Sequence, residues 1–411
     1  MRRIRAFEHS RLDIGSALTA GEAAELMTVH DALPANGRLR ALERGHNCLL
    51  VRGHVGTIAA DSVTLDILPK IARDDGPMLQ GVLVRMIAAT LGLELHEGAA
   101  RETAFQSHTL LDVFIALFAR RVESEAARGW ARSYSRRRAD LPKLRGKLDL
   151  GRQFSALAGR TDVLSCRYDE FTADTPLNRV LRAAIRAVQP VTQDYRTRQR
   201  LTALDAQMGE VADVPPLTAA ALPVTLDRRT RRWEPALRLA RLLLEARSQT
   251  VHGRGGRGIT FLFNMHQLFE RYLAVECRRL FEAEGWQVSA SGHSRWFDTT
   301  RSLRLRPDIL LRRAGRTVVV DAKWKTPGER TVAHGDAYQM FAYARAFQSQ
   351  EVVPVYPLRQ ASDAGRQVVW ELPDGVKLRA VWLDLADERA FRRGLETLVV
   401  THAARLASAS G

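Results

Sequence analysis

The fold of the C-terminal third is decided by the stretch RPDILLRRAGRTVVVDAKWK, residues 306–325. Two extended apolar runs flank an Ala-Gly pair, which is the pattern of a β-hairpin. Alternate side chains share a face of a strand, so Asp321 and Lys323 leave the second run on the same side. Hairpin pairing would bring Asp308, which follows Pro307 in the first run, beside Asp321. The stretch therefore predicts two carboxylates and one ammonium group close together.

The residues around this hairpin predict a mixed α/β fold. Helical periodicity runs from residue 261 to about 284, where Gly285 ends it. After the hairpin, residues 337–347 have a helical pattern and residues 352–356 an extended one. Elements that alternate in this way are expected to form an α/β sandwich around a central sheet.

The chain is long enough for several domains, each with its own core. Three parts are expected: a strand-rich N-terminal module of residues 1–75, a mainly helical middle region of residues 76–250, and an α/β domain of residues 251–411. Strands are predicted at residues 47–51 and 63–68 in the first part. The glycine-rich segment 252–258 marks the last boundary, because so many glycines disfavour a helix or strand.

The charge balance indicates a polyanionic partner. The 411 residues include 62 Lys and Arg against 46 Asp and Glu, a formal net charge of +16. Such a balance suits nucleic acid, whose phosphates release counterions when neutralised, and it is unusual for an enzyme with a small-molecule substrate. The basic run 136–138 is interpreted either as a phosphate contact or as a solvated loop.

Other classes of function are disfavoured by missing motifs. The order G-x-x-x-x-G-K-[ST] does not occur, so the chain is not expected to hydrolyse nucleotides by itself. Three scattered cysteines without a C-x-x-C pair argue against structural zinc and for a reducing compartment. No secretion signal or membrane-length apolar run is recognised, so we expect a cytoplasmic protein without a membrane partner.

The predicted acid pair has the chemistry of phosphodiester hydrolysis. Carboxylates as close as Asp308 and Asp321 repel each other unless a cation neutralises them, and oxygen ligands favour Mg²⁺ or Mn²⁺. The ion would polarise the phosphate and activate water, while Lys323 orients that water or offsets the charge that develops on phosphate.

Two helices are expected to contribute to the same site. Glu270, on the preceding helix, is a candidate for a further metal ligand. Gln339 and Tyr343 on the following helix are spaced i and i+4, so both are presented on one face, where they can hold a phosphate or fix Lys323.

The order of these residues resembles the PD-(D/E)xK nuclease superfamily, and nearly the whole chain is similar to the McrC family, the nuclease subunits of McrBC modification-dependent restriction systems. The segments that carry the likeness are residues 65–71, 145–149, 168–179, 261–270 and 337–343. The resemblance implies a Mg²⁺-dependent DNA endonuclease that acts in defence against foreign DNA and is driven by an McrB-like AAA+ GTPase ring. It also implies that the N-terminal module docks on that ring, with DNA or partner contacts in the middle region.

The expected catalytic residues are Asp308, Asp321, Lys323, Glu270, Gln339 and Tyr343, and the expected metal ligands are Asp308, Asp321, Glu270 and Ala322. Two other functions stay open at this point. One is a non-catalytic adaptor that activates the partner, and the other is a DNA repair nuclease similar to the RecB group, which the Gln339 and Tyr343 helix suggests.

Overall fold

The computed structural model describes residues 2–31, 41–71, 76–93, 109–251, 259–290, 292, 294–325, 332–358 and 367–399. The chain forms two compact units. The first unit combines Met1–Val113 with Thr250–Gly411, and the second comprises Phe114–Gln249. This division differs from the expected boundary at residue 75, because helix α2 (Gly76–Thr90) packs on helix α10 (Met265–Phe281) inside the first unit. The predicted glycine-rich boundary, residues 252–258, lies outside the described residues.

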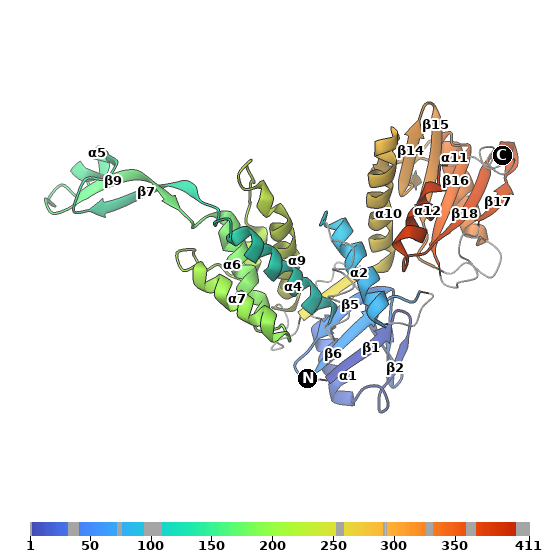
Figure 1. Ribbon diagram of the computed structural model, residues 1–411, viewed down its shortest axis with the longest axis horizontal. Helices are drawn as coiled ribbons and strands as arrows, with labels where there is room; N and C mark the ends of the chain where they lie inside the picture. The colour runs from blue at the N-terminus through green and yellow to red at the C-terminus, as the bar shows by residue number, and fades with distance from the viewer. Residues whose placement is uncertain are drawn as a thin grey trace. The chain divides into compact units, whose positions relative to one another are not determined.

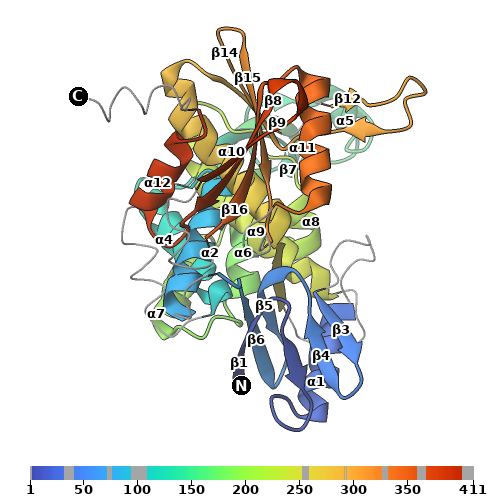
Figure 2. The ribbon, with the colours of Figure 1, turned by 90° about the vertical axis from the view of Figure 1, so that its right-hand side faces the viewer.

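The N-terminal part of the first unit contains a four-stranded sheet in the order β1-β6-β5-β10. Figure 2 labels β1, β5 and β6 of this sheet. Its strands are β1 (Arg2–Phe7), β5 (His54–Ala59), β6 (Val63–Leu68) and β10 (Ile259–Asn264). Beside it lie helix α1 (Ala20–Asp31) and a small sheet of β2 (Arg11–Asp13), β4 (Cys48–Val51) and β3 (Leu42–Gly45). The strands predicted at 47–51 and 63–68 are confirmed as β4 and β6, whereas α1 was not predicted.

Strand β10 corrects the prediction of a helix that begins at residue 261. It pairs antiparallel with β5, and Gly56 of β5 has a φ of 133°. A Cβ atom there would lie 1.9 Å from the carbonyl oxygen of Phe261, so the close pairing requires glycine. The helix begins only at Met265, because the side chain of Asn264 accepts a hydrogen bond from the Gln267 N–H and caps it.

The C-terminal part of the first unit is a mixed six-stranded sheet, and it confirms the predicted hairpin (Figure 1). The strands, in sheet order, are β11 (Gln287–Ala290), β14 (Ile309–Arg313), β15 (Arg316–Ala322), β16 (Glu351–Pro357), β18 (Lys377–Leu383) and β17 (Gln367–Glu371). Strands β14 and β15 join through Ala314 and Gly315, which both have positive φ, as a type I′ turn requires.

Helices cover both faces of this sheet (Figure 2). Helix α11 (His334–Phe347) packs on β15, β16 and β18, where Met340 and Phe347 join a core with Leu310 and Val319. Helices α10 and α12 (Glu388–Glu396) lie on the other side, and the rings of Tyr272 and Phe391 stack between them. The predicted α/β sandwich around a central sheet is therefore confirmed.

The second unit joins a helical bundle to a long ribbon of strands (Figure 1). Its helices are the main part of α4 (Leu110–Ala126), α6 (Pro176–Val188), α7 (Tyr195–Gln207), α8 (Pro216–Ala221) and α9 (Glu234–Val251). The ribbon consists of β7 (Ser133–Leu141), β9 (Leu164–Thr172) and β8 (Lys147–Leu148), with the short helix α5 (Leu150–Phe154).

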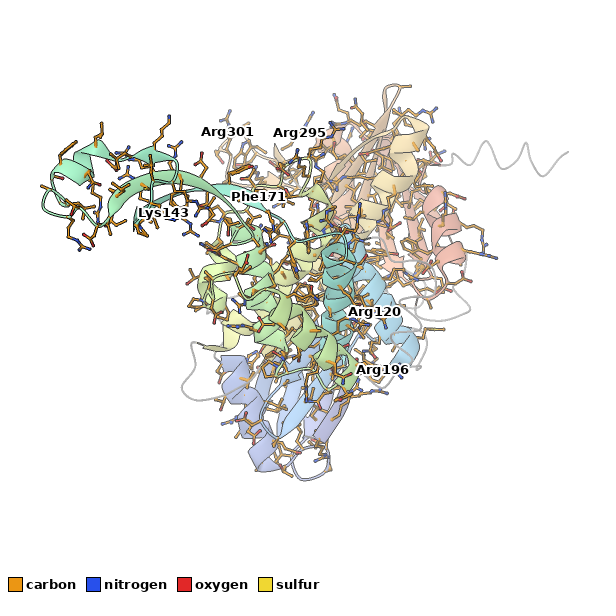
Figure 3. All side chains as sticks on the ribbon, turned by 60° about the vertical axis from the view of Figure 1, so that its left-hand side comes forward. Arg120, Lys143, Phe171, Arg196, Arg295 and Arg301 are labelled. Carbon is orange, nitrogen blue, oxygen red and sulfur yellow. The ribbon has the colours of Figure 1, made fainter. Side chains whose placement is uncertain are left out.

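The ribbon was missed by the prediction of a mainly helical middle region. Most residues of β7 are exposed, and only Ser165 and Cys166 of β9 are buried, so these strands carry little of the apolar alternation that identifies a strand. The basic run 136–138 lies within β7, so its interpretation as a loop is wrong. Figure 3 shows Lys143 on this ribbon and Phe171 nearer the helices. Among the described helices of both units, none has the length and apolar character needed to cross a membrane.

Candidate active site

The β14–β15 hairpin places the two predicted aspartates side by side. Ile309 pairs with Val320, so Asp308 is brought to the end of β15. There its Oδ2 accepts a hydrogen bond of 2.8 Å from the N–H of Ala322, the residue after Asp321. The local sequence thus fixes the pair, because a two-residue turn sets the register and the register sets which residues meet.

Lys323 lies between Asp321 and helix α11. Its Nζ is 2.6 Å from Asp321 Oδ2 and donates a hydrogen bond of 2.7 Å to Gln339 Oε1. Gln339 Nε2 in turn donates to Tyr343 Oη at 2.9 Å, and Tyr343 Oη donates to the carbonyl oxygen of Arg306 at 2.9 Å. The spacing of Gln339 and Tyr343 therefore does present both side chains on one face, and they hold Lys323 from the helix side.

Burial and neighbouring charges raise the pKa of both aspartates. Burial, followed by the negative charges of Asp321 and Glu270, raises the pKa of Asp308 to about 7. Burial also raises the pKa of Asp321, although the nearby Lys323 ammonium acts in the opposite direction. A shared carboxylate site of this kind holds a proton or a cation more readily than two bare charges.

Glu270 on α10 contributes charge to the site. Its carboxylate is close enough to raise the pKa of both aspartates and of Tyr343. Among the described residues, however, no three side chains of His, Cys, Asp or Glu gather closely enough to form a metal site by themselves. Glu270 and Ala322 therefore stay predicted ligands, although the Ala322 N–H does bind Asp308.

The donor set still fits a hard divalent cation. Asp308 and Asp321 present carboxylate oxygens, which Mg²⁺ and Mn²⁺ prefer, and burial raises the pKa of both groups. Mg²⁺ sites commonly use one or two carboxylates, with water and substrate phosphate as the other ligands. The pair is thus compatible with a metal that is completed by water and DNA.

Three further residues belong to the cluster and were not predicted. Buried Asp336, in the first turn of α11, accepts a hydrogen bond of 2.7 Å from Lys325 and one of 3.2 Å from Tyr356 Oη. Asp336 Oδ1 is also 3.8 Å from Lys323 Nζ. A signal for Lys325 was present, since it is one of two lysines in the pentapeptide DAKWK in a chain with only six lysines.

The residue between these lysines connects the site to the N-terminal sheet. Trp324 is buried, and its Nε1–H donates a hydrogen bond of 2.8 Å to Oε1 of the fully buried Glu8. The backbone N–H of Lys70 donates to the same oxygen at 3.0 Å. The Trp324 ring also makes an edge contact with Phe269, which precedes Glu270 on α10. The end of the D-x-K strand is thus packed against both parts of the first unit.

The fold and this cluster define a mixed α/β protein with an acid and lysine site at the end of a β-hairpin. Residues 49–357 match the family described as "McrBC 5-methylcytosine restriction system component". Because this match spans well over half of the sequence, the chain belongs to that family. Comparison with curated protein sequences found no match.

Solved structures from Thermococcus gammatolerans share the fold. One is a half-complex from a tetradecameric assembly of McrB AAA+ hexamers with bound McrC. The likeness to it has a TM-score of 0.75 at 21% identity and covers 97% of this chain and 100% of that one. The other is a cryo-EM structure of the McrBC complex, with a TM-score of 0.52 at 23% identity, covering 67% of this chain and 87% of that one. At such identities the likeness establishes the fold.

Proposed function

We propose that this chain is the DNA-cutting subunit of a modification-dependent restriction system and hydrolyses phosphodiester bonds with Mg²⁺. Its partner would be an McrB-like AAA+ GTPase ring, as in the complexes from Thermococcus gammatolerans, and its role would be defence against foreign DNA. The observation that carries the proposal is the contact of Lys323 with Asp321 at 2.6 Å, beside a second aspartate, Asp308, whose pKa is raised to about 7.

The proposed metal ligands are Asp308, Asp321, Glu270 and the carbonyl of Ala322. A bound ion would supply a Lewis acid for the phosphate and a lowered pKa for a water molecule. Lys323, which is held between Asp321 and Gln339, brings an ammonium group to the place where negative charge develops on the phosphate. Tyr343 keeps Gln339 in position through the 2.9 Å hydrogen bond to Nε2.

The test is cleavage of methylated duplex DNA by the full chain together with its GTPase partner, GTP and Mg²⁺. Asp321→Asn and Lys323→Ala are each expected to reduce the rate about 100-fold or more, the usual loss when a transition-state group is removed. Glu371→Gln, at an exposed acid of β17, is the matched control and should cut like the wild type.

A second readout separates cutting from partner activation. The GTPase rate of the ring in the presence of Asp321→Asn should stay at the level that the wild-type chain supports. If neither the wild type nor the variants cut under any condition while GTP hydrolysis is still stimulated, the chain is an adaptor and the proposal is wrong. Digestion from DNA ends without any dependence on methylation would favour a repair nuclease.

A further inference from the structure

A short hairpin leads directly into the candidate active site. Strands β12 (Arg295–Trp296) and β13 (Arg304–Leu305) pair antiparallel, and Asp308 follows three residues after β13. In Figure 2 this ribbon projects from the C-terminal sheet beyond α11. Nothing in the proposed chemistry uses it, although it lies next to the reacting groups in the sequence.

The tip of the hairpin is held in one conformation by an aspartate. Asp298 accepts hydrogen bonds from the backbone N–H of Ser302 at 3.0 Å and of Leu303 at 2.8 Å, and from the Thr300 hydroxyl. These hydrogen bonds lower the pKa of Asp298, so its carboxylate stays ionised and continues to accept them. Arg301 adopts a φ of 57°, which is rare for a residue other than glycine and persists only where the surroundings enforce it.

The base of the hairpin is attached to the helix that holds the catalytic lysine. Arg295 Nη1 donates a hydrogen bond of 2.7 Å to the carbonyl of Ala346 on α11, and its guanidinium lies over the Phe347 ring. Leu305 packs against the core that includes Tyr343. These contacts attach the base of the hairpin to α11. A ligand bound at the tip would therefore be held in a constant position relative to Asp308.

The surface of the hairpin combines exposed apolar groups with positive charge. Trp296, Phe297 and Leu303 are 48%, 59% and 57% exposed, which is unusual for large apolar side chains so close together in sequence. Arg301, Arg304 and Arg306 are exposed, and among the described residues no carboxylate forms an ion pair with them. Arg304 donates a hydrogen bond of 2.6 Å to the Ser294 hydroxyl, and its guanidinium lies over the Trp296 ring. Figure 3 labels Arg295 and Arg301 on this element.

We propose that the β12–β13 hairpin is a DNA-gripping element that enters a groove of the duplex beside the bond to be cut. The apolar tip, chiefly Phe297 and Leu303, would wedge against bases and sugars, while Arg301 and Arg304 bind the flanking phosphates. The inference rests on the proposed function and adds the element that presents DNA to the site. Wedges of this kind work with any sequence, because every base offers an apolar face.

Charge and chemistry favour DNA over a protein as the ligand of this hairpin. A protein surface would need acids placed opposite three arginines that form no ion pair with the described carboxylates, whereas a duplex supplies phosphates along both walls of a groove. A two-stranded ribbon also fits a DNA groove in width. The rigid tip suits such a contact, since an element that is already ordered loses little conformational entropy on binding.

The test measures binding of the full chain to a short fluorescent DNA duplex by anisotropy, in EDTA and over a series of salt concentrations. Phe297→Ala should weaken binding about tenfold with an unchanged salt dependence, because it removes a stacking contact. Arg301→Gln combined with Arg304→Gln should weaken binding and lower the slope of log Kd against log salt by about 2. Arg392→Gln, at an exposed arginine of α12 on the other face of the sheet, is the matched control.

The outcomes separate this inference from the proposed function. If the variants at the hairpin bind DNA like the Arg392→Gln control, the hairpin does not grip DNA and the inference is overturned. It is also overturned if they bind DNA normally but no longer associate with the GTPase partner, since the hairpin is then a protein-docking surface. Weaker DNA binding by these variants supports the inference, even if the wild-type complex fails to cut and the proposed function falls.

Discussion

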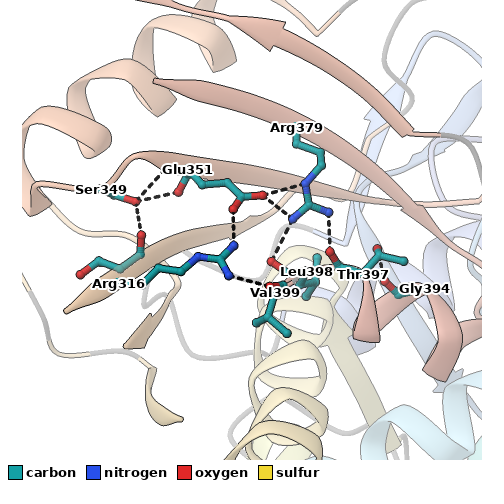
Figure 4. Close-up of polar contacts among 9 residues, drawn as sticks. Arg316, Ser349, Glu351, Arg379, Gly394, Thr397, Leu398 and Val399 are labelled. Carbon is teal, nitrogen blue, oxygen red and sulfur yellow. Dashed lines mark hydrogen bonds and ion pairs between the residues drawn. The ribbon is translucent and has the colours of Figure 1, made fainter. Parts of the chain in front are cut away.

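Two groups of buried charge in the C-terminal sheet differ in how they are balanced. At the start of β16, the Glu351 carboxylate accepts hydrogen bonds of 2.6 and 2.8 Å from Arg379 and one of 2.7 Å from Arg316 (Figure 4). The arginines also donate to the carbonyls of Thr397, Leu398 and Val399, which follow α12 in the sequence. At the end of β15, three aspartates are grouped with two lysines, and Glu270 adds its negative charge nearby. The aspartates are Asp308, Asp321 and Asp336, and the lysines are Lys323 and Lys325.

We interpret this difference as the one between a structural ion cluster and the proposed active site. Around Glu351 positive charge exceeds negative charge and the donors find acceptors, as buried charges normally must. Around Asp308 and Asp321 the described aspartates outnumber the lysines, and burial raises the pKa of both of these aspartates. Such an imbalance costs stability, so it is expected where a cation or substrate completes the site.

The largest effect on stability is expected in the balanced cluster. Arg379→Met leaves Glu351 buried with only the more exposed Arg316, so the free energy of unfolding should fall by about 3–5 kcal/mol. Arg316→Met, which leaves the buried partner in place, should cost about 1 kcal/mol. Urea denaturation of the full chain measures both. Equal losses for the two variants would mean that the buried Arg379 stabilises Glu351 no more than the more exposed Arg316 does.

An intermediate effect is expected at Glu8, a buried acid without an arginine. Among the described atoms its Oε2 has no hydrogen-bond partner, and Oε1 accepts hydrogen bonds from the Trp324 side chain and the Lys70 backbone N–H. Trp324→Phe removes that donor and should lower the free energy of unfolding by about 1–3 kcal/mol. Trp286→Phe is the matched control, because the buried Nε1 of Trp286 makes no hydrogen bond with the described residues. If both variants lose the same stability, the hydrogen bond to Glu8 contributes nothing.

The smallest expected change in the free energy of unfolding is an increase, at Asp308. Asp308→Asn keeps an oxygen to accept the Ala322 N–H but removes a charge that burial and two acids disfavour. Because the folded pKa of about 7 lies above the unfolded value, ionised Asp308 destabilises the folded state increasingly as pH rises from about 4 to about 7. In EDTA at pH 8, Asp308→Asn should therefore be more stable by about 1–2 kcal/mol.

The comparison of two pH values checks this assignment. At pH 4 the wild-type carboxyl is neutral in the folded state, so the advantage of Asp308→Asn should largely disappear in thermal unfolding. If Asp308→Asn is no more stable than the wild type at pH 8, the ionised Asp308 carboxylate does not destabilise the folded state.

The core of the site was predictable because it is local. The Ala314-Gly315 turn sets the register of β14 and β15, and the register brings Asp308 to the end of β15 beside Asp321. Helical spacing likewise sufficed to place Gln339 and Tyr343 on one face. The residues that meet are 14 positions apart in the hairpin and four positions apart in the helix, so turn chemistry and periodicity are enough.

The parts that were missed depend on contacts between distant segments. The sequence of strand β10 has a pattern that also suits a helix, and only its pairing with β5 makes it a strand. Glu8 and Trp324 are 316 positions apart, so the local sequence around neither residue predicts their hydrogen bond. Asp336 reads as an ordinary first-turn acid of a helix until the fold brings Lys325 and Tyr356 to it.

The claim that the acid pair is completed by a divalent cation can be tested directly by ion binding. The full chain is titrated with Mn²⁺ as the probe, and the free ion is followed by its electron paramagnetic resonance signal. The wild type and Asp374→Asn, at an exposed acid of the same part of the chain, should bind one ion at this site, whereas Asp308→Asn and Asp321→Asn should lose it. Undiminished Mn²⁺ binding by both site variants would contradict the account.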